Sequence, residues 1–504
     1  MKGLTLSLLI LTVVATVTRV ARCHEPFQMI FQWNTIDVIW PTEEMRQVAL
    51  RKGGYVPANN LISGIKLWKK KMYLTVPRWK NGVPVTLGVT SAIPIERNTA
   101  PKLEAFPNWA MQKVGDCSAF QSVRGMEIDP KGRMWVLDTG RPSSLTLNSK
   151  SECKPRLIIL DLEDKGKILR SYEFPEDVAP RATAYLNDIV LDHEDGGMAY
   201  ITDNGNSDPG IIVYSLKNNT SWKIRHESMS AKSEAVGFMV SKIHVILPIH
   251  VDGIALSPAS SKDRQVYYSP ISSFHLYSLP TSVLKNNTKD VNRYVKELGR
   301  KSSQTDGMVM SATGVLYFGL LNDDAVATWD TKQSNSITTG QKNISRDHTH
   351  MQWPDTFAFD EDGNFYCVTN SFQNFINNLV DVNVPNYRVF QTSVSSNSYQ
   401  YFEDGSVPQL PNITADEVPQ LPNITSDAVP QQPNITADAV PQLPNITADA
   451  VPQLPNITAN AVPQLTNVTA NVAPHLPNTT AGATGLFLIL PKILLPLFLL
   501  HISN

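Results

Sequence analysis

A strand–turn–strand pattern that recurs along the chain constrains its fold more than any other feature. The best-formed copy occupies residues 115–141, where apolar and polar residues alternate on either side of the turn Asp129-Pro-Lys-Gly132. Similar segments recur at intervals of 49 to 65 residues, and they begin at Gly64, Gly125, Asp188, Gly253, Gly307 and Thr356. Six such hairpins in series indicate one repeated structural unit.

Each interval contains Val-, Ile-, Leu- and Tyr-rich runs separated by Gly, Pro, Asn and Asp, enough for about four strands. Only residues 41–52 show helical periodicity. Strand-only units of similar size favour a propeller, because a blade buries its faces only against neighbouring blades. We therefore predict an all-β, six-bladed β-propeller. A two-sheet sandwich is the alternative, but it would not explain six similar units.

The two ends of the chain differ from this repeated region. Residues 1–23 combine Lys2, an apolar run and a small-residue cleavage site, which predicts a secretory signal peptide. The run is too short to favour a membrane-spanning helix. We expect the propeller to occupy residues 24–403, a disordered Pro-rich stalk to occupy 404–483, and a hydrophobic C-terminal signal to occupy 484–504.

The stalk is built from seven successive 11-residue units over residues 407–483, four of which begin VPQLPNIT. Recurrent prolines exclude a continuous helix, and the lack of Lys, Arg and aromatic residues leaves nothing to form a packed core. A neutral spacer with no specific partner is one interpretation. Each unit carries an Asn-x-Thr acceptor for N-glycosylation, at Asn412, Asn423, Asn434, Asn445, Asn456, Asn467 and Asn478.

The last segment has an apolar run at 486–502 behind a group of small residues. Pro491, Lys492 and Pro496 make this run a poor membrane-spanning helix. Small residues followed by an apolar tail favour a cleaved signal for a GPI anchor. A retained membrane tail and a soluble segment stay open as alternatives.

Beyond residue 23 the chain has three cysteines, so we expect one disulfide bond and one free thiol in an oxidising compartment. Cys117 and Cys153 flank the second hairpin and are the expected pair. Cys367 lies in an apolar strand and is expected to be a buried free thiol. Within residues 24–403 the basic and acidic side chains number 40 each, so we expect no nucleic-acid partner.

Several long motifs resemble those of the Yellow/major royal jelly protein family of insects. They are VPRWKNGVPVTL at 76–87, GDCSAFQSVRGMEIDPKGRMWVLDTG at 115–140, CKPRLIILDL at 153–162, DGIALSP at 252–258, VYYSPISSFHLYSL at 266–279 and GVLYFGL at 314–320. The resemblance covers roughly residues 27–402 and implies secretion, a six-bladed propeller, and a role in cuticle pigmentation, larval food or amine binding. Lys131 stands where many members have cysteine, so a disulfide bond of those members is absent.

One residue before each repeat start is expected to face the channel along the propeller axis. These six residues are Ser63, Arg124, Asn187, Asp252, Asp306 and Asp355. Together they could hold an amine, a calcium ion or, through Arg124, an anion. In the alternative interpretation, each Asp accepts hydrogen bonds from turn amides of its own blade.

The family's amine-binding members use a polar and aromatic cluster in the last blade. The resemblance places that cluster here at Asn370, Phe372 and, less closely, Thr356. An aromatic face beside a carboxylate attracts a protonated aryl-ethylamine. Alternatively, Phe372 packs between blades and Asn370 ends a strand.

The sequence contains none of the motifs that specify a nucleophile, a P-loop or a zinc protease site. His348 and His350 form an H-x-H pair beside Asp347, which we interpret as an exposed loop and not as a metal site. Our leading hypothesis is a secreted or tethered propeller that binds a small catechol or aryl-amine ligand. The alternatives are a dopachrome-tautomerase-like enzyme using Asp252 and Asp306, a calcium-dependent lactonase, and a nutritive or structural glycoprotein.

Three further N-glycosylation acceptors are expected on outward-facing turns between strands: Asn218 (or its neighbour Asn219), Asn286 and Asn343. The oligomeric state does not follow from the sequence.

Overall fold

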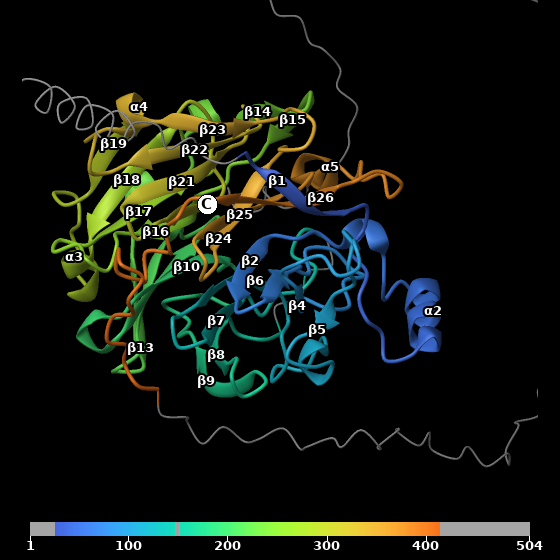
Figure 1. Ribbon diagram of the computed structural model, residues 1–504. Coiled ribbons are helices and arrows are strands. Elements are labelled where there is room, and N and C mark those ends of the chain that lie inside the picture. The colour runs from blue at the N-terminus through green and yellow to red at the C-terminus, as the bar shows by residue number, and fades with distance from the viewer. Residues whose placement is uncertain (1–25, 147–148, 150–151, 414–504) are drawn as a thin grey trace, which may run out of the picture. The chain divides into compact units, whose positions relative to one another are not determined.

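The computed structural model describes residues 26–146, 149 and 152–413, which form six four-stranded antiparallel sheets. The innermost strands of neighbouring sheets contact one another in cyclic order, so the sheets surround a central axis as blades (Figure 1). The predicted six-bladed β-propeller is therefore confirmed. The predicted signal peptide, the C-terminal hydrophobic signal and the repeat units beyond residue 413 lie outside the described residues.

The first three blades follow one another along the chain, and each runs outward from the axis. Blade 1 consists of β2 (Gly64–Trp68), β3 (Lys71–Thr75), β4 (Leu87–Ser91) and β5 (Glu104–Ala105). Blade 2 consists of β6 (Val123–Ile128), β7 (Arg133–Asp138), β8 (Arg156–Asp161) and β9 (Lys167–Glu173). Blade 3 consists of β10 (Leu186–Asp192), β11 (Met198–Asp203), β12 (Gly210–Ser215) and β13 (Thr220–Ile224).

The remaining blades keep this order until the last. Blade 4 consists of β16 (Val251–Leu256), β17 (Gln265–Pro270), β18 (His275–Pro280) and β19 (Lys296–Arg300). Blade 5 consists of β20 (Met308–Met310), β21 (Val315–Leu320), β22 (Ala325–Asp330) and β23 (Lys342–Arg346). Blade 6 consists of β24 (Pro354–Phe359), β25 (Asn364–Thr369), β26 (Tyr387–Ser393) and, outermost, β1 (Gln28–Trp33).

The last blade therefore joins the two ends of the described chain. β1 pairs with β26 in antiparallel register, with Phe31 opposite Val389 and Trp33 opposite Tyr387. A bulge between Met29 and Phe31 interrupts the pairing. This pairing closes the ring of blades.

Side chains alternate across each blade and so bury both of its faces. On β7, Met134 and Val136 pack into a core cluster shared with blade 1, whereas Trp135 and Leu137 pack into a cluster shared with blade 3. Successive residues of a strand point to opposite faces of the sheet. The run RMWVLD is thus continuously buried, because each face meets a different neighbouring blade.

Outside the blades, the chain forms a hairpin of β14 (Gly237–Val240) and β15 (Ile243–Ile246) and several short helices. The longest helix, α2 (Glu43–Lys52), matches the stretch with helical periodicity; Thr42 caps its start and Gly53 ends it at φ +74°. The others are α3 (Thr281–Lys285), α4 (Ile337–Gly340) and α5 (Phe372–Ile376). Within the part of the chain that the structure describes, no helix combines the length and apolar character that crossing a membrane requires.

The cysteine predictions are confirmed. Cys117 and Cys153 form a disulfide bond between residues 36 positions apart. Cys367 is a free thiol, fully buried in β25.

The described glycosylation acceptors are all exposed, at Asn218, Asn286, Asn343 and Asn412. Asn218 lies in the turn between β12 and β13, and Asn286 directly follows α3. The expectation that Asn343 lies on a turn is wrong, because it lies inside β23. It is nevertheless exposed because β23 is the outermost strand of its blade.

Candidate functional site

The six positions that the sequence analysis assigns to the channel lie at the starts of the innermost strands, which we call the ring end. Here neighbouring inner strands approach very closely. A Cβ atom on Gly253 would lie 2.2 Å from the carbonyl oxygen of Asp306, and one on Gly307 would lie 2.2 Å from that of Asp355. Only glycine permits such an approach. This explains why a glycine follows the ring residue in these two repeats.

Four of the six residues form a connected polar chain across four blades. The Arg124 guanidinium donates a hydrogen bond to Asn187 Oδ1. The Asn187 amide donates to Asp252 Oδ1 at 2.5 Å, and Asp252 shares a further hydrogen bond with Asp306. The structure therefore brings these four residues together at one end of the channel.

The other two positions join the ring less directly. Asp355 Oδ2 accepts a 2.6 Å hydrogen bond from Asn370, whose buried amide also donates to the Ile62 carbonyl oxygen at 2.9 Å. Ser63 Oγ lies 3.5 Å from Thr75 Oγ1 in its own blade. Asp355 thus lies near the ring with Asn370 attached, whereas Ser63 makes its contact within blade 1.

The carboxyl groups of Asp252 and Asp306 bond to side chains of other blades, and not to turn amides of their own. Asp252 Oδ2 accepts a 2.6 Å hydrogen bond from Asn204, a residue that the sequence analysis missed. Asp306 Oδ2 accepts a 2.7 Å bond from the Trp353 indole nitrogen. These contacts argue against the alternative interpretation of the two residues as turn-forming aspartates.

Aromatic side chains surround Arg124. Its guanidinium carbon lies 4.8 Å from the ring centroid of Trp79 and 4.7 Å from that of Tyr185. Such distances are typical of cation–π contacts. Both rings come from connections between strands, which do not repeat from blade to blade, so the repeat pattern gave no reason to assign them.

Phe372 continues this aromatic wall at the start of α5. Its ring centroid lies 4.8 Å from that of Trp353 and 5.3 Å from that of Trp79. Phe372 is half-buried, so it both packs against these indoles and contributes to the surface at the ring end. Thr356 lies behind Gly307, with its Cα 3.3 Å from the position of a Cβ there.

Burial of several acids in one place changes their ionisation. Burial raises the pKa of Asp355 to about 8. Burial and the nearby Asp355 and Asp252 carboxyls raise the pKa of Asp306 well above its usual range. Burial also raises the pKa of Asp252, although Arg124 lowers it in part. Asp306 and Asp252 are therefore a hydrogen-bonded pair of buried carboxyl groups, both with a raised pKa.

The opposite end of the channel is covered by residues 397–401, which we call the strap. The Tyr399 amide donates to the Met310 carbonyl oxygen at 2.9 Å, and the Tyr399 hydroxyl accepts from the Leu191 amide at 2.8 Å. The Gln400 side-chain amide donates to the Ile128 carbonyl oxygen at 2.9 Å. The strap thus ties the far ends of three inner strands together.

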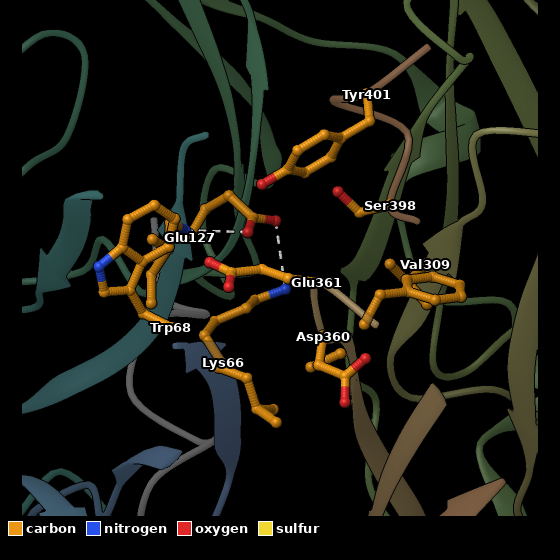
Figure 2. A pocket seen from close by; sticks show the side chains of 12 residues that line it. Lys66, Trp68, Glu127, Val309, Asp360, Glu361, Ser398 and Tyr401 are labelled. Carbon is orange, nitrogen blue, oxygen red and sulfur yellow. Dashed lines mark hydrogen bonds and ion pairs between the residues drawn. The ribbon is translucent and has the colours of Figure 1, made fainter. Parts of the chain in front are cut away.

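A small pocket lies beside the strap (Figure 2). Lys66 and Glu127 form an ion pair of 3.1 Å in its wall. Burial raises the pKa of Glu127, and Lys66 partly offsets this. Figure 2 shows Tyr401 and Ser398 on the same pocket as this ion pair. The sequence analysis missed this site, although Lys66 and Glu127 occupy the same register, three positions after Ser63 and Arg124.

The H-x-H pair does not converge on one point. His348 Nδ1 lies 2.9 Å from Asp324 Oδ2, whereas His350 Nδ1 lies 2.8 Å from Asp347 Oδ2. Among the described residues no three His, Cys, Asp or Glu side chains are grouped so that they could hold a metal ion.

The chain is similar in sequence to a known protein family and to two of its characterised members. A model of the major royal jelly protein family matches residues 121–399. Dopaminechrome tautomerase of Drosophila melanogaster is 26% identical over 383 residues, covering 73% of this chain and 82% of the relative. Protein yellow of Drosophila yakuba is 27% identical over 380 residues, covering 73% and 68%. Among solved structures, a luciferin-regenerating enzyme matches 69% of this chain and 96% of its own, at 10% identity and a TM-score of 0.40.

Proposed function

Because the chain belongs to the Yellow/major royal jelly protein family, we propose that it binds a small catechol-derived or aryl-amine ligand at the ring end of its channel. One observation carries the proposal: three carboxyl groups lie beside an aromatic wall at the same end. A protonated amine is attracted both by a carboxylate and by the face of an aromatic ring. Asp306 is only half-buried, so it is the ring carboxyl best exposed to such a ligand.

Thermal shift measurements on the full-length protein test this proposal. Dopamine should raise the melting temperature more than catechol, which lacks the amine. Asp306→Asn should weaken dopamine binding about tenfold, or ~1.4 kcal/mol, by removing the carboxyl group that would pair with the ligand's ammonium group. Glu361→Gln, which changes an exposed residue at the strap end, serves as the matched control. Equal increases in melting temperature with dopamine and catechol would contradict the amine-binding proposal and favour the nutritive or structural alternative.

A second candidate function is tautomerisation of a dopachrome-type quinone. The hydrogen-bonded carboxyl pair of Asp306 and Asp252 favours it, as does the similarity to a dopaminechrome tautomerase. In such a step, Asp252 takes a proton from a ring carbon and the C–H electron pair moves into the ring. Asp306 then delivers a proton to the quinone oxygen. Protons and electrons balance, so no external oxidant is required.

Turnover of dopaminechrome, followed by its loss of visible absorbance, tests the second candidate. Asp252→Asn and Asp306→Asn should each lower the rate about 10²-fold or more, because each removes one proton-transfer group. Retained dopamine binding without turnover in the wild type would exclude catalysis while leaving the binding proposal intact. Adding a calcium chelator tests the calcium-dependent lactonase alternative. We expect neither the melting temperature nor the rate to change.

We further propose that the protein is a secreted glycoprotein of the insect extracellular matrix, tethered through its C-terminus and linked to pigmentation. The predicted signal peptide, the ten predicted acceptor asparagines and the C-terminal apolar run support this setting. Treating expressing cells with a phospholipase that cleaves GPI anchors should release the protein into the medium. Protein that stays with the cells would argue for a retained membrane tail instead.

A further inference from the structure

The first repeat unit of the tail is docked on the propeller. After the strap, residues 407–413, with the sequence VPQLPNI, follow the surface of blades 2 and 3. Leu410 is only 5% exposed, and Ile413 packs against the core cluster that contains Trp135 and Leu216. We call these seven residues the resident segment.

The resident segment rests on four residues, Lys131, Arg133, Gly197 and Leu216, which we call the docking surface. Arg133 Nη1 donates a 2.6 Å hydrogen bond to the Pro411 carbonyl oxygen, and Lys131 Nζ lies 3.5 Å from that of Leu410. A Cβ atom on Gly197 would lie 2.9 Å from Pro411 Cγ and 3.1 Å from Leu216 Cδ2. The proline ring therefore occupies space that any larger residue at position 197 would fill.

The docking surface is held in shape by buried charge. Arg133 forms a 2.6 Å ion pair with Asp129, which is fully buried, so its guanidinium is fixed before a peptide arrives. Nη2 of the same guanidinium is buried and has no hydrogen-bond partner among the described residues. A donor that is already fixed in place beside a proline-sized space can bind a backbone carbonyl oxygen with little loss of conformational freedom.

The groups that dock recur in the tail sequence. The units at 418–428, 440–450 and 451–461 repeat VPQLPNI without change. The other three units differ at the docked positions: Gln432 replaces the leucine, Thr466 replaces the proline, and Thr479 replaces the isoleucine. Asn412 of the resident segment is exposed, so a glycan on the equivalent asparagine would not obstruct docking.

We propose that the docking surface is a peptide-binding site for VPQLPNI, and that it accepts such a segment from the tail of a second copy of this chain. Each copy carries one docking surface and four matching segments, so segments outnumber surfaces. A proline-rich peptide is already extended and loses little conformational freedom on binding. The resident segment competes from a short tether, so association between copies requires a high local concentration.

Two peptides taken from the chain itself test the site. The full-length Leu410→Gln variant, which copies the natural change at Gln432, weakens the resident segment and leaves the surface accessible. Fluorescent VPQLPNITA should bind this variant saturably in an anisotropy titration. VPQQPNITA, the natural sequence of the third unit, should bind at least tenfold more weakly. Equal binding of the two peptides, or no binding of either, would overturn the proposal.

Two controls separate docking from a general loss of structure. Asn412→Gln changes an exposed residue of the same segment, so this variant should bind VPQLPNITA as weakly as the wild type does. Sedimentation velocity of the wild type should show association that increases with protein concentration and is reversed by excess VPQLPNITA. Concentration-independent sedimentation, or association that the peptide does not reverse, would overturn the second copy as the partner.

Discussion

The two ends of the channel are built by the same six strands, yet their buried acids and bases are balanced differently. At the ring end, Asp252, Asp306 and Asp355 lie near a single cation, Arg124. At the strap end, Lys66 forms an ion pair with Glu127 and also partly lowers the raised pKa of Asp188, and the strap covers the opening. Incompletely balanced charge in a buried place is typical of functional sites, whereas a matched pair can be purely structural. The contrast is why we propose the ring end as the ligand-binding site.

The largest expected loss of stability comes from breaking the ion pair between Lys66 and Glu127. Lys66→Met should lower the free energy of unfolding by about 3 kcal/mol, because it leaves the buried Glu127 carboxylate without its partner. The double variant Lys66→Met/Glu127→Leu should recover part of this loss, since the Glu127 carboxylate is then absent, whereas Asp188 still lacks its interaction with Lys66. Urea denaturation measures both. If the single and double variants lose equal stability, the unpaired charge of Glu127 is not the cause of the loss.

The next prediction concerns how the free energy of unfolding depends on pH through a carboxyl group at the ring end. The pKa of Asp355 is raised to about 8 in the folded protein, so the unfolded chain ionises first as pH rises. The folded state then binds more protons than the unfolded state, and stability falls as the pH rises from about 4 to 8. Asp355→Asn should flatten this dependence, as measured by urea denaturation across that range. A variant with the wild-type slope would show that Asp355 is not the group responsible.

The smallest effect concerns the strap. Tyr399→Phe removes the hydroxyl that accepts from the Leu191 amide and should cost about 1 kcal/mol. Tyr401→Phe is the matched control, because the Tyr401 hydroxyl has no hydrogen bond among the described residues; its cost should stay below about 0.5 kcal/mol. Thermal denaturation compares the two variants. Equal losses would mean that the Tyr399 hydroxyl does not stabilise the strap.

The sequence predicts the blades well because their signal is local and repeated. Alternating apolar residues around a turn fix each inner hairpin, and the residue before each repeat start keeps the same register in all six. That is why Arg124, Asn187, Asp252 and Asp306 could be placed at one end in advance. The pairing of Cys117 with Cys153 followed from their positions flanking one hairpin.

What the repeats could not predict lies in segments that do not repeat. Trp79, Tyr185 and Trp353 come from connections of unequal length, and only the folded chain brings them to the ring end. The change in composition after residue 403 predicts a stalk from that point. In the structure, however, residues up to 413 remain on the propeller, because Leu410 and Ile413 find apolar contacts there.

Because β1 closes the ring, the last blade cannot form until β26 has been synthesised. Gln28 pairs with Gln391, which is 363 positions later in the chain. At a synthesis rate of roughly 5–20 residues per second, β1 leaves the ribosome about 20–70 s before its partner strand. Through that interval the nascent chain carries an apolar strand with no neighbour to cover it. A propeller closed in this way therefore depends on its folding environment until the last strand is made, and premature termination anywhere before β26 leaves an open sheet edge.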